Sequence, residues 1–142
     1  MFDYILDTNV IMSMLISGKS SYKTIVMFNR FVTIDYLFNE IDEYKMTIFE
    51  KTKLERNQLI EYTNQILSKV TVLPRYVVND KNLKKAAELT QGVDFDDVWF
   101  VALSLEYNLT LLTRDEKLYK GLRKKGFEKI MLFDQFLKSF LQ

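Results

Sequence analysis

Several aspartates of this chain gather in one stretch, from Gly92 to Asp115. Read at 100° per residue, Asp94 and Asp97 share one face of a helix predicted at residues 95–107, and that face is otherwise apolar. An uncompensated carboxylate on an inward face is costly, so paired acids there predict a cation that neutralises them. Carboxylate oxygens favour hard ions, which points to Mg²⁺ or Mn²⁺.

Three further acids are predicted near the ends of strands. Asp7 and Asp115 each come at the end of a short apolar run that predicts a strand, and Glu40 lies in the first turns after another. Functional groups of open parallel sheets collect outside the carboxyl ends of the strands. We therefore expect these three acids and Asp97 to converge. Taken singly, each acid could equally well cap a helix. Their joint placement at one edge favours a shared site.

The absence of two residue types excludes several catalytic mechanisms. The 142 residues include no histidine and no cysteine. Without histidine there are no imidazole general bases, no Ser-His or Cys-His nucleophilic pairs, and few ways to build a catalytic zinc site. Without cysteine there are no disulfides or thiolate zinc sites. The remaining candidate chemistry is that of carboxylates with a bound ion.

Size and composition predict one globular domain over residues 1–142. Hydrophobic residues make up 48% of the chain, enough for one sizeable core. The formal net charge of +1 gives no global argument for a polyanionic partner. The amino terminus lacks the pattern of a signal peptide, and no apolar run is long enough to span a bilayer. We therefore expect a cytoplasmic protein without a membrane partner.

Short apolar strands alternate with helices along the chain. The strands are predicted at 4–6, 31–34, 70–73, 109–112 and 129–133. The helices are predicted from Val10, after a cap at Ser20 or Ser21, over 35–49 after a cap at Asp35, over 51–69, after Asn79 or Asp80, over 95–107, over 116–126 and from Asp134. This alternation is typical of an α/β fold with a mostly parallel sheet.

Four segments resemble, in order and spacing, the acidic motifs of PIN-domain proteins, including toxin-type and stand-alone prokaryotic members. The segments are Leu6-Asp7-Thr8-Asn9-Val10, Asn39-Glu40-Ile41, Asp94-Phe95-Asp96-Asp97 leading into Val101-Ala102-Leu103, and Leu112-Thr113-Arg114-Asp115. The resemblance covers essentially the whole chain. It implies a three-layer α/β/α sandwich with a central, mostly parallel sheet, and a Mg²⁺- or Mn²⁺-dependent endoribonuclease that acts on single-stranded RNA.

The resemblance also implies roles for individual residues. The catalytic, metal-holding acids would be Asp7, Glu40, Asp97 and Asp115, with Asp94 as a fifth metal ligand. The side chains that orient these acids would be Thr8, Asn9 and Thr113. Two alternatives stay open, because Glu43 could replace Glu40 and Asp96 could replace Asp94. Helical phase favours Asp94, since Asp96 points about 100° away from Asp97.

With these residue types, the expected reaction is attack of a metal-activated water on a phosphodiester. Arg114 and Lys117, directly around Asp115, are the candidate contacts to substrate phosphates. The basic helix at 116–126 is interpreted equally well as a solvated amphipathic helix. The aromatic candidates for base stacking are Tyr36, Tyr44 and Trp99, for which core packing is the commoner role.

A second class of function is a catalytically inactive PIN-like module that binds RNA or protein. Retention of all four acids argues against it, because metal ligands are the first residues that such a module can lose. Within the ribonuclease interpretation, the chain is either the toxin of a toxin-antitoxin pair or an RNA-processing enzyme. The partners that the resemblance implies are an RNA substrate, an antitoxin protein and a second copy of the chain.

Overall fold

A parallel β-sheet forms the centre of the computed structural model, which describes residues 1–140. Within this range the sheet has five strands in the order β3-β2-β1-β4-β5. The strands are β1 (Tyr4–Leu6), β2 (Phe31–Ile34), β3 (Thr71–Leu73), β4 (Thr110–Thr113) and β5 (Ile130–Leu132). Every neighbouring pair is parallel. The predicted α/β fold is therefore confirmed.

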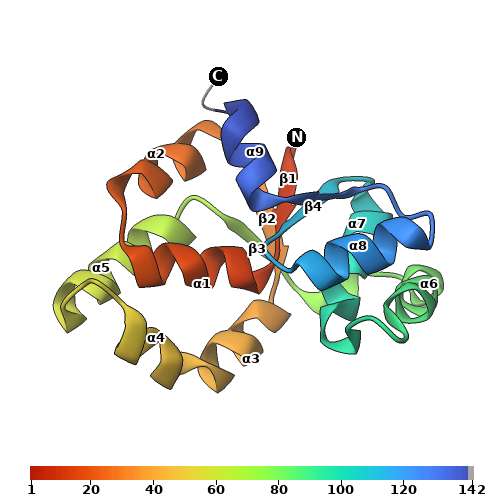
Figure 1. Ribbon diagram of the computed structural model, residues 1–142, viewed down its shortest axis with the longest axis horizontal. Helices are drawn as coiled ribbons and strands as arrows, with labels where there is room; N and C mark the ends of the chain where they lie inside the picture. The colour runs from red at the N-terminus through yellow and green to blue at the C-terminus, as the bar shows by residue number, and fades with distance from the viewer. Residues whose placement is uncertain (141–142) are drawn as a thin grey trace.

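Helices cover both faces of the sheet and make a three-layer α/β/α sandwich. The helices of the described residues are α1 (Thr8–Ser17), α2 (Ser20–Phe28), α3 (Tyr36–Glu43), α4 (Lys45–Lys51), α5 (Arg56–Leu67), α6 (Asp80–Thr90), α7 (Val98–Tyr107), α8 (Glu116–Lys124) and α9 (Phe133–Phe140), with the 3₁₀ turns η1 (Arg75–Val77) and η2 (Phe95–Asp97). Figure 1 shows α1 to α5 on one side of the sheet and α6 to α8 on the other. Phe136 of α9 packs edge-on against Tyr4 of β1 at 5.0 Å between ring centroids.

The strand order contains one topological switch point. The chain runs outward from β1 to β2 and β3, returns through α6 and α7 to β4 on the other side of β1, and forms β5, the last strand, beyond β4. The loops after β1 and β4 therefore leave the sheet in opposite directions and open a crevice between them. In parallel α/β sheets this crevice, at the carboxyl ends of the strands, is where ligands bind.

The middle of the sheet is buried on both faces. All four residues of β2 are buried, and Ile5 and Leu6 of β1 are fully buried. Strands covered on both faces read as continuous apolar runs, which explains why these two were predicted correctly. The polar exception in β2 is Thr33, whose hydroxyl donates to the Leu6 carbonyl at 2.7 Å.

The single helix predicted at 35–49 is wrong. The chain forms α3 and α4, separated at Tyr44, where φ is −102° and ψ is 13°. Asp35 holds the N-cap position of α3 as predicted, but its side chain makes no capping hydrogen bond and pairs with Arg75, with 2.9 Å between Oδ1 and Nε. The break lets α4 turn back onto α1 and bury Ile48, and it leaves Tyr44 43% exposed. Tertiary packing thus overrides a continuous helical pattern.

The helix predicted at 51–69 begins too early. The Thr52 hydroxyl donates to the Leu15 carbonyl of α1 at 2.9 Å and holds the chain in a loop. The helix α5 starts only after Glu55, whose side chain forms a reciprocal capping box with that of Gln58.

Other boundaries differ by smaller amounts. Neither serine predicted as the cap of α2 holds that position, which Lys19 occupies. Gly18 ends α1 in the left-handed conformation, so the chain enters α2 earlier than a serine cap requires. The last three strands differ from the prediction by one residue at one end or at both ends. The cap of α6 is as predicted, because Asn79 accepts a hydrogen bond from the Asn82 backbone at 2.8 Å.

The membrane criterion can be applied to the described helices. None of the helices formed by residues 1–140 combines the length and the apolar character that a bilayer span requires.

Candidate metal centre

The ends of β1 and β4 hold Asp7 and Asp115 in one hydrogen-bond network. The Thr113 hydroxyl donates to Asp7 Oδ2 at 2.8 Å and accepts from the Asp115 backbone N–H at 3.1 Å. The Asn9 amide donates to Asp7 and to Thr113, both at 3.2 Å, and its oxygen accepts from the Arg114 backbone at 2.9 Å. The carboxylate of Asp7, in a residue only 2% exposed, is therefore oriented by side chains from both strand ends.

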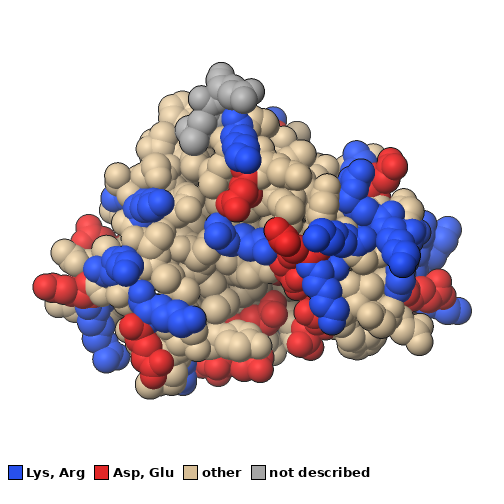
Figure 2. Space-filling model, in the orientation of Figure 1, with Lys and Arg blue, Asp and Glu red and all other residues tan. Residues whose placement is uncertain are grey.

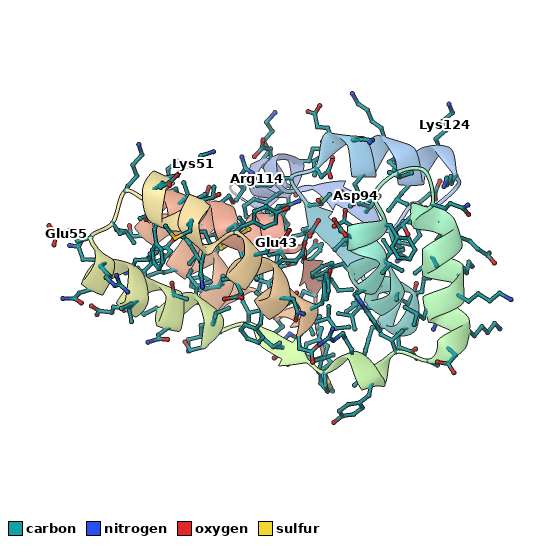
Figure 3. The ribbon with its side chains drawn as sticks, turned by 90° about the horizontal axis from the view of Figure 1, so that it is seen from below. Glu43, Lys51, Glu55, Asp94, Arg114 and Lys124 are labelled. Atoms are coloured by element: carbon teal, nitrogen blue, oxygen red, sulfur yellow. The ribbon has the colours of Figure 1, made fainter. Side chains whose placement is uncertain are left out.

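The start of α3 brings Glu40 to the same place. The Thr8 hydroxyl donates to Glu40 Oε1 at 2.7 Å. Among the described residues, Glu40 lines the hollow next to Asp7, whereas the exposed Glu43 does not. Figure 3 labels Glu43 on α3 and Asp94 ahead of η2, on opposite sides of the site.

The turn before α7 presents three aspartates. Asp94 accepts a hydrogen bond from the Asp96 backbone at 3.1 Å and so caps η2. Asp97 follows at the start of α7 and is 6% exposed. The regular helix predicted from Phe95 begins instead as a 3₁₀ turn. Asp96 also lines the hollow, contrary to the expectation from α-helical phase.

These acids surround a hollow of about 260 Å³, which we call the acidic hollow. It is lined by Asp7, Thr8, Asn9, Met12, Glu40, Tyr44, Asp94, Asp96, Asp97 and Asp115. Carboxylate oxygens of Asp94, Asp97 and Asp115 lie within 4.8 Å of one another. Sequence reasoning misses Met12. Its position one helical turn after Thr8 is the signal that could have found it.

Burial and mutual repulsion raise the pKa values of three of the acids. Burial, with a contribution from the charge of Asp115, raises the pKa of Asp7 to about 6. Burial, followed by the charge of Asp7, raises the pKa of Glu40 to about 7. Burial and then the charges of Asp7, Asp94, Glu40 and Asp115 raise the pKa of Asp97 to about 10. The carboxyl groups of Asp7, Glu40 and Asp97 thus interact with one another and with the neighbouring acids as one cluster.

The donor set fits a divalent cation. The carboxylates present only oxygen atoms, and several of them are close enough to share one ion. A positive charge in the hollow would offset both the repulsion and the burial that raise these pKa values. Asp115 caps α8 as well, since it accepts from the Leu118 backbone at 3.0 Å. Capping and cation binding are therefore compatible at this residue.

Basic side chains lie on α8, next to the acids. Figure 2 shows acidic side chains between α3 and α8, and basic side chains over α8. Arg114 is exposed and lies 3.7 Å from Asp134 of α9. Lys117 is exposed in the first turn of α8. These two residues are the predicted phosphate contacts, and both lie at the start of α8, beside Asp115.

The far end of α8 has structural roles. Lys125 donates to the backbone carbonyls of Leu89 and Gln91 at the end of α6. The Arg123 guanidinium lies over the Tyr119 ring at 5.4 Å. Figure 3 shows Lys124 at the outer end of α8, away from Asp94. The basic helix as a whole does not face the acidic hollow.

The fold and the site together define a class of protein: a three-layer α/β/α domain with a carboxylate cluster at the switch point of a parallel sheet. The chain belongs to the PIN-domain family, whose model matches residues 5–133. PIN domains are in general nucleases that act on nucleic acids, and they typically use divalent metal ions. The resemblance inferred from the acidic motifs is therefore confirmed.

A solved structure shares this fold. The chain is similar to the crystal structure of PAE2754 from Pyrobaculum aerophilum, with a TM-score of 0.69 and 14% sequence identity. The match covers 97% of this chain and 88% of that chain. At this identity the similarity shows the fold alone. No curated protein matches the chain in sequence.

Proposed function

We propose that this protein is a Mg²⁺- or Mn²⁺-dependent endoribonuclease that hydrolyses phosphodiester bonds in single-stranded RNA. The observation that carries the proposal is the cluster of Asp94, Asp97 and Asp115 in a hollow shared with Asp7 and Glu40. Membership of a nuclease family supports the reaction class. We propose further that residues 1–142 form a single PIN domain.

The residues of the hollow divide the work of such a reaction. We assign Asp7, Glu40, Asp97 and Asp115 to catalysis and metal binding, with Asp94 as an additional ligand, and Thr8, Asn9 and Thr113 to orienting them. The chemistry that a divalent ion supplies is activation of water and stabilisation of charge on the phosphoryl group. A carboxylate of the hollow accepts the proton of the attacking water. Arg114 and Lys117 bind phosphates of the substrate.

Variants of the hollow test the proposal. Asp97→Asn and Asp7→Asn should each lower the cleavage rate of single-stranded RNA by more than the roughly 10- to 100-fold that loss of an outer hydrogen-bond partner costs. EDTA should abolish cleavage, and circular dichroism should be unchanged. Asp42→Asn, an exposed acid of α3, is the matched control. Wild-type cleavage in excess EDTA, or full activity of either variant, would contradict the proposal.

We propose that the chain acts in the cytoplasm, either as a toxin or as an RNA-processing enzyme. A toxin requires an antitoxin partner, and many PIN proteins pair with a second copy. Exposed apolar side chains on α3 to α5 support a protein partner: Phe38, Met46, Phe49 and Ile60. A small antitoxin encoded beside this chain that co-purifies with it and inhibits cleavage would support the toxin role. Light scattering of the purified chain measures dimer formation.

A further inference from the structure

A cluster centred on a single arginine, Arg75, lies at the end of β3, on the same edge of the sheet as the acidic hollow. Pro74 ends β3, and Arg75 begins η1. The Asp35 backbone donates to the Leu73 carbonyl at 2.8 Å, so the segments that follow β2 and β3 lie side by side. Arg75 Nε lies 2.9 Å from Asp35 Oδ1. That oxygen is buried and has no hydrogen-bond partner among residues 1–140, so its contact with Arg75 is a close ion pair without the geometry of a hydrogen bond.

Two aromatic rings hold the guanidinium of Arg75. Its central carbon lies 5.7 Å from the centroid of Tyr36 and 5.9 Å from that of Trp99. Tyr36 begins α3, and Trp99 lies in the first turn of α7, two residues after Asp97. The rings therefore come from the two elements that carry acids into the hollow. The side chain of Arg75 is still 40% exposed, so it is pre-oriented and open to solvent.

Tyr36 connects this cluster to the acidic hollow. It lies one helical turn before Glu40 on α3. Burial and the charges of Glu40 and Asp96 raise the pKa of the Tyr36 hydroxyl, whereas Arg75 lowers it. The phenol of Tyr36 is thus close enough to the acids and to the guanidinium to be influenced by the charges of both.

The ion pair with Asp35 uses Nε and leaves the two terminal nitrogens of the guanidinium. Among the ion pairs and hydrogen bonds of residues 1–140, these nitrogens have no carboxylate partner. A planar guanidinium on a side chain that is 40% exposed can match the oxygens of a phosphodiester. An RNA strand that crosses the acidic hollow in the direction from β4 to β3 would pass the acids first and then reach Arg75.

We propose that Arg75, held by Asp35, Tyr36 and Trp99, is a substrate-binding residue that contacts a phosphate of single-stranded RNA on the β3 side of the scissile linkage. This inference rests on the proposed ribonuclease function. Together with Arg114 and Lys117 on the β4 side, it places cations on both sides of the acids. In an RNA strand bound in this way, the cations on both sides hold the scissile phosphodiester next to the carboxylates. Without these cations the carboxylates would repel the phosphodiester.

The test uses Arg75→Gln, which removes the charge and keeps a polar side chain. Loss of one charge-assisted hydrogen bond should weaken binding of a short single-stranded RNA, measured in Ca²⁺, by about ten- to a hundredfold. The slope of log K against log salt should fall by about 0.7, the value for one phosphate on a single strand. In cleavage assays KM should rise with kcat unchanged. Arg56→Gln is the matched control, because Arg56 also lies over a ring, that of Phe49, at 5.4 Å.

Chemically modified RNAs distinguish a phosphate contact by Arg75 from a purely structural role of this residue. RNAs in which one linkage at a time is a neutral methylphosphonate should reveal one linkage whose neutralisation weakens wild-type binding but does not weaken binding by Arg75→Gln. Arg75→Lys, which keeps the charge without the fork, should recover the salt slope and only part of the affinity. If Arg75→Gln does not fold, Arg75→Lys is compared with the wild type by affinity and salt slope, and its affinity should fall while its salt slope stays the same.

Three results would overturn the inference: RNA binding by Arg75→Gln equal to wild type, a variant that keeps wild-type sensitivity at every linkage, or no RNA binding by the wild type. The proposed hydrolysis is judged separately by its products. RNA bound through Arg75 but never cleaved would refute hydrolysis and leave this subsite standing. Cleavage by Arg75→Gln with wild-type KM would support hydrolysis and refute the role of Arg75 in substrate binding.

Discussion

The contribution of Glu40 to the stability of the metal-free protein should depend on pH, because its carboxyl is partly buried next to other acids. Burial and neighbouring charge raise its pKa from 4.5 to about 7. Between these values the folded protein holds more protons at this group than the unfolded chain does, so the group makes stability fall as pH rises.

Glu40→Gln should therefore flatten this dependence. In EDTA, its melting temperature should fall less than that of the wild type as pH rises from 4.5 to 7. The matched control is Glu43→Gln, which alters an exposed acid on the same helix and should follow the wild type. The same pair assigns the ligand, since only Glu40→Gln should lose metal-dependent cleavage. The opposite ranking in either assay would place Glu43 in the site.

The hydroxyl of Thr113 should contribute both to the stability of the fold and to metal affinity. Its buried hydroxyl serves both Asp7 and the Asp115 backbone. Thr113→Val keeps the shape and removes the hydroxyl, so it should cost about 1–3 kcal/mol of unfolding free energy and lower metal affinity roughly 10- to 100-fold. Calorimetric titration with Mn²⁺ and a denaturant melt measure the two effects.

Thr33→Val is the control for this substitution. Thr33 is equally buried in β2, on the other side of β1, but its hydroxyl serves the Leu6 carbonyl. It should lose stability and keep its Mn²⁺ affinity. Equal affinities for both valine variants would show that the Thr113 hydroxyl does not orient the metal ligands.

At the scale of elements, close contact between α8 and the segment before η2 positions Asp94. A Cβ atom at Gly121 of α8 would lie 2.7 Å from Cγ1 of Val93. Valine is stiff about χ1 and cannot swing away, so the segment that carries Asp94 would have to move.

Gly121→Ala therefore sets two effects against each other. Helix propensity favours alanine by about 1 kcal/mol, whereas overpacking costs about 1–3 kcal/mol. We expect net destabilisation and weaker Mn²⁺ binding. The double variant Gly121→Ala with Val93→Ala should restore both, as measured by melts and calorimetry. A more stable single variant with wild-type Mn²⁺ affinity would show that this contact does not position Asp94.

For the whole molecule, the acidic hollow predicts opposite effects of one substitution with and without metal. In EDTA near pH 7, folding must protonate Asp97, because its pKa rises from 3.8 in the unfolded chain to about 10 in the folded protein. Asp97→Asn removes this cost and should melt above the wild type. A bound ion stabilises the folded state by RT ln(1 + [M]/Kd), about 2.7 kcal/mol at a hundredfold excess over Kd. Mn²⁺ should therefore raise the melting temperature of the wild type much more than that of the variant.

Asp42→Asn controls for the loss of a carboxylate elsewhere on the surface, and it should gain as much from Mn²⁺ as the wild type does. A wild type that gains nothing from Mn²⁺ would mean that the acids of the hollow do not hold an ion.

The sequence by itself determined the strands β1 and β2, the alternation of strands and helices, and the acidic motifs. These features are local or nearly so. Strands buried on both faces are continuous apolar runs, and the motifs lie at strand ends where the chain must turn. The identity of the acids therefore pointed to the PIN family before any contact was known.

Only the tertiary structure decided which distant residues meet. The break at Tyr44 lies inside an unbroken apolar pattern, and it exists because α4 packs on α1. The contact of Arg75 with Tyr36 and Trp99 joins three segments whose local patterns carry no mutual signal. Periodicity records which face of an element is buried, whereas the partner of that face depends on the strand order and on how the helices cross the sheet.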